Sequence, residues 1–353
     1  MRAHRFITTA RAGHAHRGGA RIVMAAAAAA VFFASAEPSH AVVFYETSSS
    51  THNTTAPTGA YSGAGWEYEG LFGGFLGTMI SPQLFITAQH IGVQGSTFVS
   101  SSLFNGVADV TYTIDASANS GVGFWDITGT DLRIYKINES FSSYAQLYTH
   151  ANETGRTLVT NGRGGPRGAD VTVSAELKGW QTGGSDGVAR WGANEVTGIV
   201  SSPVGDLLVA QFNAVNGLEE SFLSSGDSGG GVFIKDGATW KLAGVNYAIE
   251  ADFDTNNVTG DNSNFSGAIF DKGGLYQGSD AGGWTLIPDD GADIPEQFFV
   301  SRISSNATEI NSIIQAVPEP GGALLVAAGA LLALRRRRGP PRSPSRAALR
   351  AVR

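Results

Sequence analysis

Short runs of apolar residues, broken by polar residues and glycines, recur through the middle of the chain and predict strands joined by turns. The clearest run follows Asp131, where apolar and polar side chains alternate over 132–137. Further strands are expected at 72–80, 84–90, 110–114, 194–199, 206–212, 232–234 and 240–245, the last two joined in a hairpin by 235–239. Glycine is abundant (47) and threonine, serine and valine recur, which favours strands and turns over long helices. The pattern therefore predicts an all-β fold.

The composition allows a substantial core and excludes several kinds of chemistry. The chain has 353 residues, 42% of them apolar, which is enough for one large or two ordinary domains. It contains no cysteine, so disulfide bonds, a cysteine nucleophile and a thiolate-bound metal are excluded. Acidic and amide residues at 252–257 suggest a calcium loop, but Asn257 stands where glycine is required and no glutamate closes the loop. We expect a polar loop there, no metal site and no cofactor.

The first 41 residues have the pattern of an export signal. Five arginines precede an apolar run over 22–34, and small residues follow it. Ser39 and Ala41 fit a small-x-small cleavage site, with 34–36 as a second choice. A membrane anchor is the alternative, although the run is short for a bilayer span. We therefore expect a signal peptide over 1–41 and a mature chain that begins with an N-terminal arm over 42–69.

A second processing signal is expected over 316–338. Pro318, Glu319 and Pro320 are followed by fourteen uncharged small and apolar residues and then by four arginines at 335–338. This three-part ending resembles the PEP-CTERM sorting signal of Gram-negative bacteria, which an exosortase processes. The resemblance implies a transient inner-membrane tether and delivery to the periplasm, cell surface or extracellular matrix. A basic tail over 339–353 extends beyond the usual end of that signal.

The charge of the part between the two signals argues against nucleic-acid partners. Outside the export signal and the residues after Pro320, 11 Lys and Arg face 30 Asp and Glu, a net charge near −19. Such a domain repels phosphate backbones and anionic membrane surfaces.

Ser228 lies in the stretch Ser-Ser-Gly-Asp-Ser-Gly-Gly-Gly at 224–231, among residues with little side-chain bulk. Glycines on both sides let the backbone turn tightly and let N–H groups point at a ligand beside the hydroxyl. The same stretch, taken alone, is also typical of a turn between strands. The residues upstream favour an active-site loop.

Two upstream segments supply the partners that a serine nucleophile needs. An apolar strand ends in Thr-Ala-Gln-His at His90, and Asp131 begins the alternating strand. These segments closely resemble the histidine and aspartate segments of the trypsin/chymotrypsin-like (S1) serine peptidases, in the same chain order. Asp126 is the rival for the aspartate. We prefer Asp131, because the strand after it has the pattern to fix a buried carboxylate beside an imidazole.

The resemblance covers roughly 70–245 and implies a chymotrypsin-like peptidase domain over 70–315, built from two six-stranded antiparallel β-barrels. Ile91 stands where that family has a cysteine, so packing must replace its local disulfide. The expected activity is that of a secreted serine endopeptidase acting on protein or peptide substrates.

The resemblance also assigns roles. Ser228 would be the nucleophile, His90 the general base and then acid, and Asp131 the group that orients the imidazole. The backbone N–H groups of Gly226 and Ser228 would form the oxyanion hole. By the same resemblance, Asp227 would pair with the amino terminus that zymogen cleavage creates. The expected amino-terminal residues, Val-Val-Phe from Val42, differ from the family's usual Ile-Val-Gly-Gly.

Specificity is expected to depart from that of trypsin. Alignment on Ser228 puts Phe222 at the floor of the primary pocket, where a trypsin has an acid, so no preference for Arg or Lys is expected. Tyr247 and Ile249 replace small residues in the pocket wall and would narrow it. The alternative function is a trypsin-fold binding or matrix protein with little or no proteolytic activity.

Overall fold

The computed structural model describes residues 42–183, 186–215, 217 and 219–317, which belong to one compact unit. The expected signal peptide, the sorting segment from Pro318 onward and the basic tail lie outside the described residues. The described part is mainly β and antiparallel, with one curled half-barrel, which confirms the predicted fold class at that level. None of its helices is both long and apolar enough to cross a membrane.

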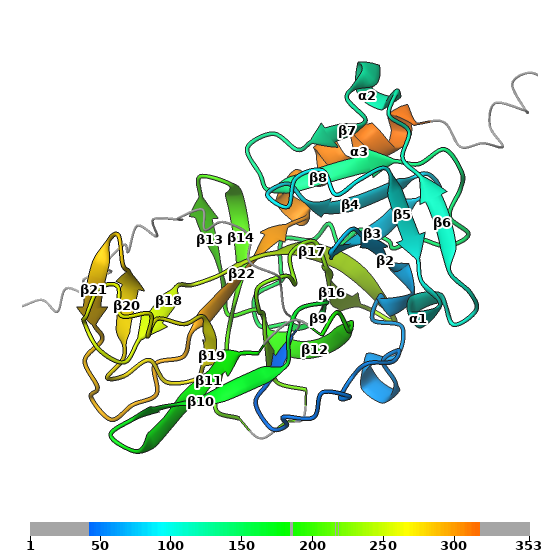
Figure 1. The fold of residues 1–353 in the computed structure, drawn as a ribbon. Coiled ribbons are helices and arrows are strands. Elements are labelled where there is room, and N and C mark those ends of the chain that lie inside the picture. The colour runs from blue at the N-terminus through cyan, green and yellow to red at the C-terminus, as the bar shows by residue number, and fades with distance from the viewer. Residues whose placement is uncertain (1–41, 184–185, 216, 218, 318–353) are drawn as a thin grey trace, which may run out of the picture. The chain divides into compact units, whose positions relative to one another are not determined.

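The first large sheet has the antiparallel strand order β6-β5-β2-β3-β4-β8-β7 (Figure 1). Its strands are β2 (Glu69–Phe72), β3 (Phe75–Ser81), β4 (Leu84–Ala88), β5 (Thr97–Ser100), β6 (Val110–Thr113), β7 (Phe124–Asp126) and β8 (Leu132–Lys136). Phe85 pairs with Tyr135 in register, and its ring stacks on those of Tyr135 and Phe98 at centroid distances of 5.2 and 4.3 Å. These buried rings give the sheet its core and fix the register of β4 against β8.

The second large sheet has the antiparallel order β12-β9-β16-β17-β22-β14-β13. Its strands are β9 (Thr157–Gly162), β12 (Arg190–Glu195), β13 (Gly198–Ser202), β14 (Gly205–Gln211), β16 (Gly231–Asp236), β17 (Thr239–Ile249) and β22 (Gln297–Arg302). The single strand predicted at 194–199 is wrong. Val196 donates its N–H to Arg156 O and Thr197 donates to Val209 O, so the chain turns between β12 and β13.

Both large sheets have seven strands, and among the described strands no ladder joins the two edges of either sheet. They share one core. Phe233 and Leu242 of the second sheet pack in the same cluster of buried side chains as Phe85 and Ile134 of the first. Side chains from both sheets therefore pack against one another in a single hydrophobic core.

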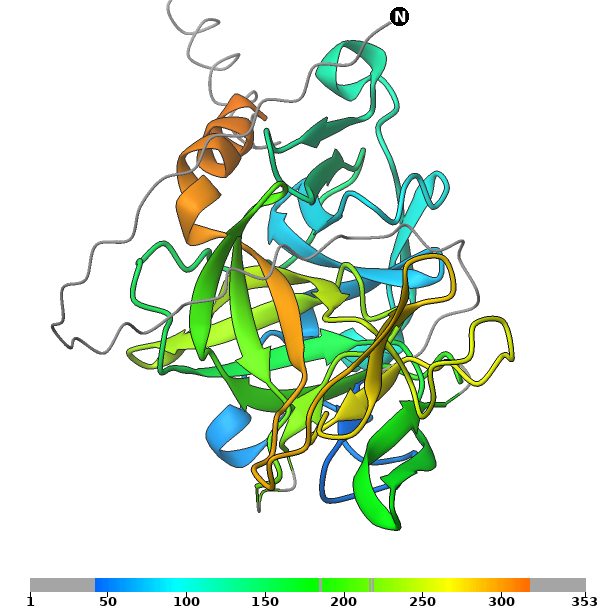
Figure 2. The same ribbon diagram turned by 90° about the vertical axis from the view of Figure 1, so that its left-hand side faces the viewer.

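Three smaller sheets surround the second large sheet. β1 (Val43–Phe44) pairs with β15 (Ser221–Phe222). β10 (Arg167–Val173), β11 (Glu176–Thr182) and β19 (Gly267–Ile269) form one three-stranded sheet, and β18 (Asp252–Asp254), β20 (Tyr276–Ser279) and β21 (Gly283–Leu286) form another. Figures 1 and 2 show β18, β20 and β21 standing beside the second large sheet, on the side away from the first.

Helices are short in the described part. They are α1 (Ser102–Asn105), α2 (Ala118–Gly121), α3 (Ala307–Ala316) and the 3-10 turns η1 (Gly59–Tyr61), η2 (Trp66–Tyr68) and η3 (Ser304–Asn306). α3 buries Ile310 and Ile313 in the core shared by the two sheets. Thr128 donates hydrogen bonds from its N–H and its hydroxyl to Glu309 Oε1. These hydrogen bonds connect α3 to the loop between β7 and β8.

Candidate active site

His90 and Asp131 are brought together by the pairing of β4 with β8. Ala88, the last residue of β4, pairs with Leu132, the first residue of β8. Antiparallel pairing therefore places the residues just after β4 beside the residue just before β8. The N–H of Gln89 donates to Asp131 O at 2.7 Å, and the N–H of His90 donates to Asp131 Oδ1 at 2.8 Å. These two hydrogen bonds from the main chain of Gln89 and His90 hold Asp131 beside His90, in addition to the contact between their side chains.

The His90 imidazole bridges Asp131 and Ser228. His90 Nδ1 lies 2.7 Å from Asp131 Oδ2, and His90 Nε2 lies 2.8 Å from Ser228 Oγ. Because a carboxylate oxygen only accepts, the geometry assigns the ring proton to Nδ1 and leaves Nε2 to accept from the serine hydroxyl. Asp131 is buried at 4% exposure, whereas the His90 side chain keeps 28% of its surface. A reactant can therefore approach the histidine while water is kept from the carboxylate.

The rival carboxylate is committed elsewhere. Both oxygens of Asp126 accept hydrogen bonds from the Arg133 guanidinium, at 2.5 and 3.0 Å. Its side chain is 36% exposed. The structure brings Asp131, and not Asp126, to the imidazole.

Glycines shape the loop that carries Ser228. Gly226 and Gly229 have φ of +96° and +85°, which is backbone that glycine adopts without strain. A Cβ on Gly229 would lie 2.4 Å from Leu76 O, and one on Gly230 would lie 1.9 Å from Asn161 O. The absence of side chains at these two positions therefore lets the loop pack directly against the first sheet and against β9.

Two backbone donors of this loop are not used inside the protein. Among the described residues, the N–H groups of Gly226 and Ser228 donate no hydrogen bond. The neighbouring N–H groups are used: that of Asp227 donates to Ser224 O, and that of Gly230 donates to Asp227 O. The two donors predicted for an oxyanion hole therefore have no acceptor within the described part of the chain, and the N–H of Ser225 also has none there.

Asn246 holds the loop from behind. This fully buried side chain on β17 donates from Nδ2 to Asp227 O at 3.0 Å and to Asn161 O at 2.8 Å, and its Oδ1 accepts from Thr160 Oγ1 at 2.9 Å. Its main chain accepts from Gly229 N and donates to Gly230 O. One residue therefore connects the nucleophile loop to β9.

Glu69 supports the next residue of the loop. Its Oε1 accepts hydrogen bonds from Gly231 N at 3.2 Å and from Thr78 Oγ1 at 2.9 Å. The carboxyl group is fully buried, and Oε2 has no hydrogen-bond partner among the described residues. Burial raises the pKa of Glu69 to about 8, against the smaller opposite effect of the two hydrogen bonds. Glu69 is therefore a neutral acid at neutral pH.

Asp227 is a second buried carboxyl group beside the nucleophile. It accepts from Gly164 N at 3.0 Å and from Ser224 N at 2.8 Å, and it has no ion-pair partner among the described residues. Burial raises the pKa of Asp227 to about 7. A Cβ on Gly162 would lie 2.1 Å from Asp227 Oδ1 and 2.9 Å from Val42 Cγ2. The start of the described chain thus borders the same glycine as this carboxyl group.

The residues predicted to line a substrate pocket lie in different surroundings. Phe222 is fully buried in the second core, where its ring contacts those of Phe212 and Phe298 at 5.5 Å each. Tyr247 is half-buried, and its ring packs edge-on to the His90 imidazole at 5.7 Å. Ile249 is half-buried against the second core. The structure brings only Tyr247 into contact with the histidine, and the joint pocket stays a prediction.

No group of three or more metal-ligating His, Asp or Glu side chains occurs within the described ranges. No protein-family model matches this chain, and no curated protein sequence matches it.

Asn246 and Glu69 were not found from the sequence. The signal for each was a polar residue near a glycine within or beside an apolar strand, Glu69 directly before Gly70 and Asn246 two residues after Gly244.

Proposed function

We propose that this protein is a secreted serine endopeptidase. The single observation that supports the proposal is that the His90 imidazole contacts Asp131 and Ser228 at the same time, each through a different ring nitrogen and at hydrogen-bond distance. The three residues come from separate segments, and each stands where the resemblance to the S1 peptidases places it. The available N–H groups of Gly226 and Ser228 add the second feature that acyl transfer needs.

Each side chain has a defined role in the proposed reaction. Ser228 Oγ attacks the carbonyl carbon of the peptide bond while its proton moves to His90 Nε2. The negative charge that forms on the carbonyl oxygen is stabilised by the N–H groups of Gly226 and Ser228, each donor worth about 3 kcal/mol in related sites. His90 then returns the proton to the leaving amine. A water molecule hydrolyses the acyl-enzyme by the same steps, with His90 as base.

Asp131 acts through the imidazole. Its Oδ2 holds the proton of Nδ1, which keeps Nε2 unprotonated and directed at Ser228. When His90 takes up the serine proton, the buried carboxylate stabilises the charge of the imidazolium. The hydrogen bond from His90 N to Oδ1 fixes the orientation of the carboxylate for both tasks.

A two-barrel, chymotrypsin-like arrangement is part of the proposal. The first large sheet carries His90 and Asp131, the loop before β16 of the second sheet carries Ser228, and the two sheets share one core. At the floor of the predicted pocket Phe222 replaces the acid of a trypsin, and this supports apolar or small residues as the preferred substrates, with Tyr247 and Ile249 narrowing the entrance.

Covalent labelling by a serine-directed phosphonate tests the proposal. The wild-type protein is expected to label at one site, and Ser228→Ala is expected to abolish labelling. Ser225→Ala is the matched control, because it removes a neighbouring exposed hydroxyl from the same loop. A folded wild type that neither labels nor cleaves peptides would reject the enzyme and favour a trypsin-fold binding or matrix protein.

The resemblance of the chain's ending also supports export and processing near 318–320, with a transient inner-membrane tether and an exosortase-type enzyme as partner. Replacement of Glu319 by alanine is expected to increase the membrane-retained fraction. Unchanged release into the medium or matrix would contradict this part of the proposal.

A further inference from the structure

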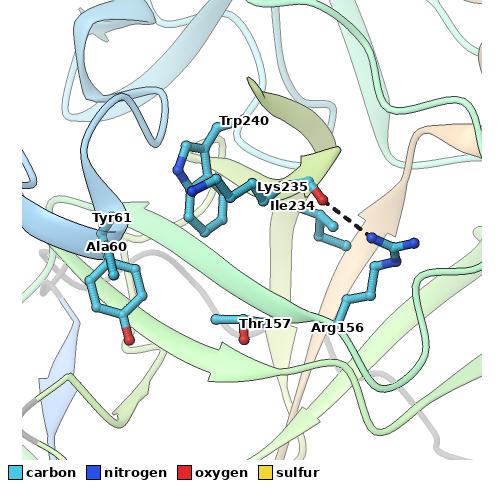
Figure 3. Close-up of a pocket in the computed structure, with 7 residues that line it drawn as sticks. All are labelled: Ala60, Tyr61, Arg156, Thr157, Ile234, Lys235 and Trp240. Atoms are coloured by element: carbon cyan, nitrogen blue, oxygen red, sulfur yellow. Dashed lines mark hydrogen bonds between the residues drawn. The ribbon is translucent and has the colours of Figure 1, made fainter. Parts of the chain in front are cut away.

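A pocket of about 470 Å³ lies at the end of β16 opposite to the Ser228 loop. Ile234, the first residue of β16 to line it, is three residues beyond Gly231, so the pocket begins roughly 10 Å along the strand from the start of β16. Figure 3 shows that two aromatic and two cationic side chains form its walls. Its lining residues are Ala60, Tyr61, Arg156, Thr157, Ile234, Lys235 and Trp240. No part of the proposed peptidase site is among them.

The cations of this pocket are unusual within the protein. The described part of the chain has eleven Lys and Arg against 29 Asp and Glu, and seven of the eleven form ion pairs with carboxylates. The four without such a partner among the described residues are Arg156, Arg163, Arg167 and Lys235. Two of these four therefore line the same cavity, although carboxylates outnumber cations almost threefold.

The surroundings of the two cations keep their charge available. Arg156 donates from Nε to Asn152 O at 3.0 Å and from Nη1 to Lys235 O at 3.3 Å, and these neutral acceptors hold the guanidinium in place without cancelling its charge (Figure 3). Asp236 is the acid next in sequence, but it pairs with Lys241 at 2.7 Å and with His150 at 3.3 Å.

The aromatic wall carries an unused donor. The ring centroids of Tyr61 and Trp240 lie 6.3 Å apart, and Lys235 Nζ lies 5.7 Å from the Trp240 ring centroid. Trp240 is only 5% exposed, and its indole N–H has no hydrogen-bond partner among the described residues. The indole nitrogen is itself buried, so the face of the ring, and not this donor, is what the wall offers to a ligand. Burial, with the charges of Glu219 and Glu220, raises the pKa of Tyr61, so its hydroxyl keeps its proton.

We propose that this pocket binds an organic carboxylate that bears an apolar or aromatic group. The carboxylate pairs with the Lys235 ammonium, which lies beside the Trp240 ring, and the apolar group packs against Tyr61 and Trp240. The Arg156 guanidinium, hydrogen-bonded to the Lys235 carbonyl on the other side, adds positive charge to the site (Figure 3). The volume suits a ligand of the size of a substituted amino acid rather than a long polymer. The site is separate from Ser228, so the inference does not depend on the proposed peptidase activity.

Isothermal titration with 3-phenylpropionate and with its neutral counterpart 3-phenylpropanamide tests the proposal on the purified protein. The acid is expected to bind at least about tenfold more tightly than the amide, because charge-assisted hydrogen bonds are the stronger ones. Lys235→Met is expected to weaken binding of the acid at least about tenfold. Arg156→Met is expected to weaken it less, because the guanidinium lies on the other side of the Lys235 main chain (Figure 3). Arg163→Met is the matched control, since Arg163 is another cation whose hydrogen bonds go only to main-chain carbonyls, and it lies outside the pocket.

Three results would overturn the inference: equal binding of acid and amide, equal weakening by Arg163→Met and Lys235→Met, or no saturable binding below about 10 mM. A second measurement does not depend on affinity. The indole N–H resonance of Trp240, identified by its loss in Trp240→Phe, is expected to shift on addition of the acid to the wild type and not on addition of the same concentration to Lys235→Met, because the phenyl group packs on the Trp240 ring. Protein labelled at Ser228 by the phosphonate should give the same titration, which separates this site from the proposed active site.

The natural ligand could be a free acid or the carboxylate of a peptide. A short peptide that ends in phenylalanine with a free carboxyl group, and its amidated counterpart, distinguish the two sources. Tighter binding of the peptide acid than of 3-phenylpropionate, with the same dependence on Lys235, points to a peptide terminus. Weaker binding of the peptide acid points to a free small acid.

Discussion

The polar groups at the two ends of β16 differ in whether they have partners within the protein. At the Ser228 end, the imidazole, the carboxylate of Asp131 and the side chain of Asn246 are each engaged by named partners within hydrogen-bond distance. At the Lys235 end, two cations lack carboxylate partners and an indole N–H has no acceptor among the described residues. The paired side chains at the Ser228 end hold the geometry of the proposed active site, whereas the two cations at the Lys235 end are available to a ligand.

Free donors occur at both ends, but they are held differently. The N–H groups of Gly226 and Ser228 belong to a backbone that Asn246 and Glu69 fix through hydrogen bonds to the same loop. Lys235 instead carries its charge on a flexible, exposed side chain. Fixed donors suit a charge that appears during a reaction, because no reorganisation is needed at that moment. Flexible donors suit a ligand that arrives already charged.

Replacement of Asp131 is expected to have the largest effect. Asp131→Asn should lower kcat/KM, or the rate of phosphonate labelling, by about 10⁴, because an amide stabilises the wrong imidazole tautomer and no charge balances the imidazolium. Asp126→Asn is the matched control and should leave the rate within about twofold, since Asp126 is paired with Arg133. A larger loss with Asp126→Asn than with Asp131→Asn would reverse the assignment.

Glu69 predicts a pH dependence of stability. Its pKa is about 8 in the folded protein and near its usual value of about 4.3 when unfolded, so the unfolded state loses its proton first as the pH rises. The free energy of unfolding should therefore fall between about pH 4 and 8, by an amount on the order of 5 kcal/mol from this group. Glu69→Gln, which keeps the shape without the charge, should flatten that decline in denaturant titrations.

Glu67→Gln provides the comparison for this measurement, because Glu67 is a near neighbour in sequence that is only half-buried. It should leave the pH profile of unfolding almost unchanged. If Glu69→Gln and the wild type lose stability in parallel between about pH 4 and 8, Glu69 does not carry the proton that its burial implies.

Asn246 is expected to have a smaller effect on both stability and rate. Asn246→Val leaves Asp227 O, Asn161 O and the Thr160 hydroxyl without their partners, which should cost about 2–3 kcal/mol in the free energy of unfolding. A displaced loop should also slow phosphonate labelling about 10- to 100-fold. Thr160→Val removes only the bond to Oδ1, so its effect on the rate should be much smaller.

The three residues of the proposed active site could be named from the sequence because their signals are local. Ser228 lies among glycines, His90 ends an apolar strand, and Asp131 begins one, so each could be recognised within a few neighbours. Asn246 depends on Asn161 and Asp227, which lie 85 and 19 residues away, and no local pattern shows that β17 and β9 flank one loop. Long-range register decides which polar residue supports the site.

The same reason explains the limits of the fold prediction. The mainly antiparallel β character followed from composition and alternation, and most of the expected strands lie where they were predicted. The small sheets formed by β10, β11, β18, β20 and β21 were missed, because their residues show no clean alternation and part of their burial comes from packing against one another. The walls of the 470 Å³ pocket come from segments as far apart as Tyr61 and Trp240 and could not be assembled from the sequence.

The smallest expected effect is the most direct test of whether the two ends of β16 act independently. Lys235→Met should leave the rate of phosphonate labelling within about twofold of the wild type, because the side chain is exposed and belongs to no hydrogen bond of the Ser228 loop. Saturating 3-phenylpropionate should also leave this rate unchanged in the wild type. A labelling rate that changes severalfold with the acid, and only when Lys235 is present, would show that the shared strand couples the pocket to Ser228. The pocket would then be a regulatory site for the proposed peptidase.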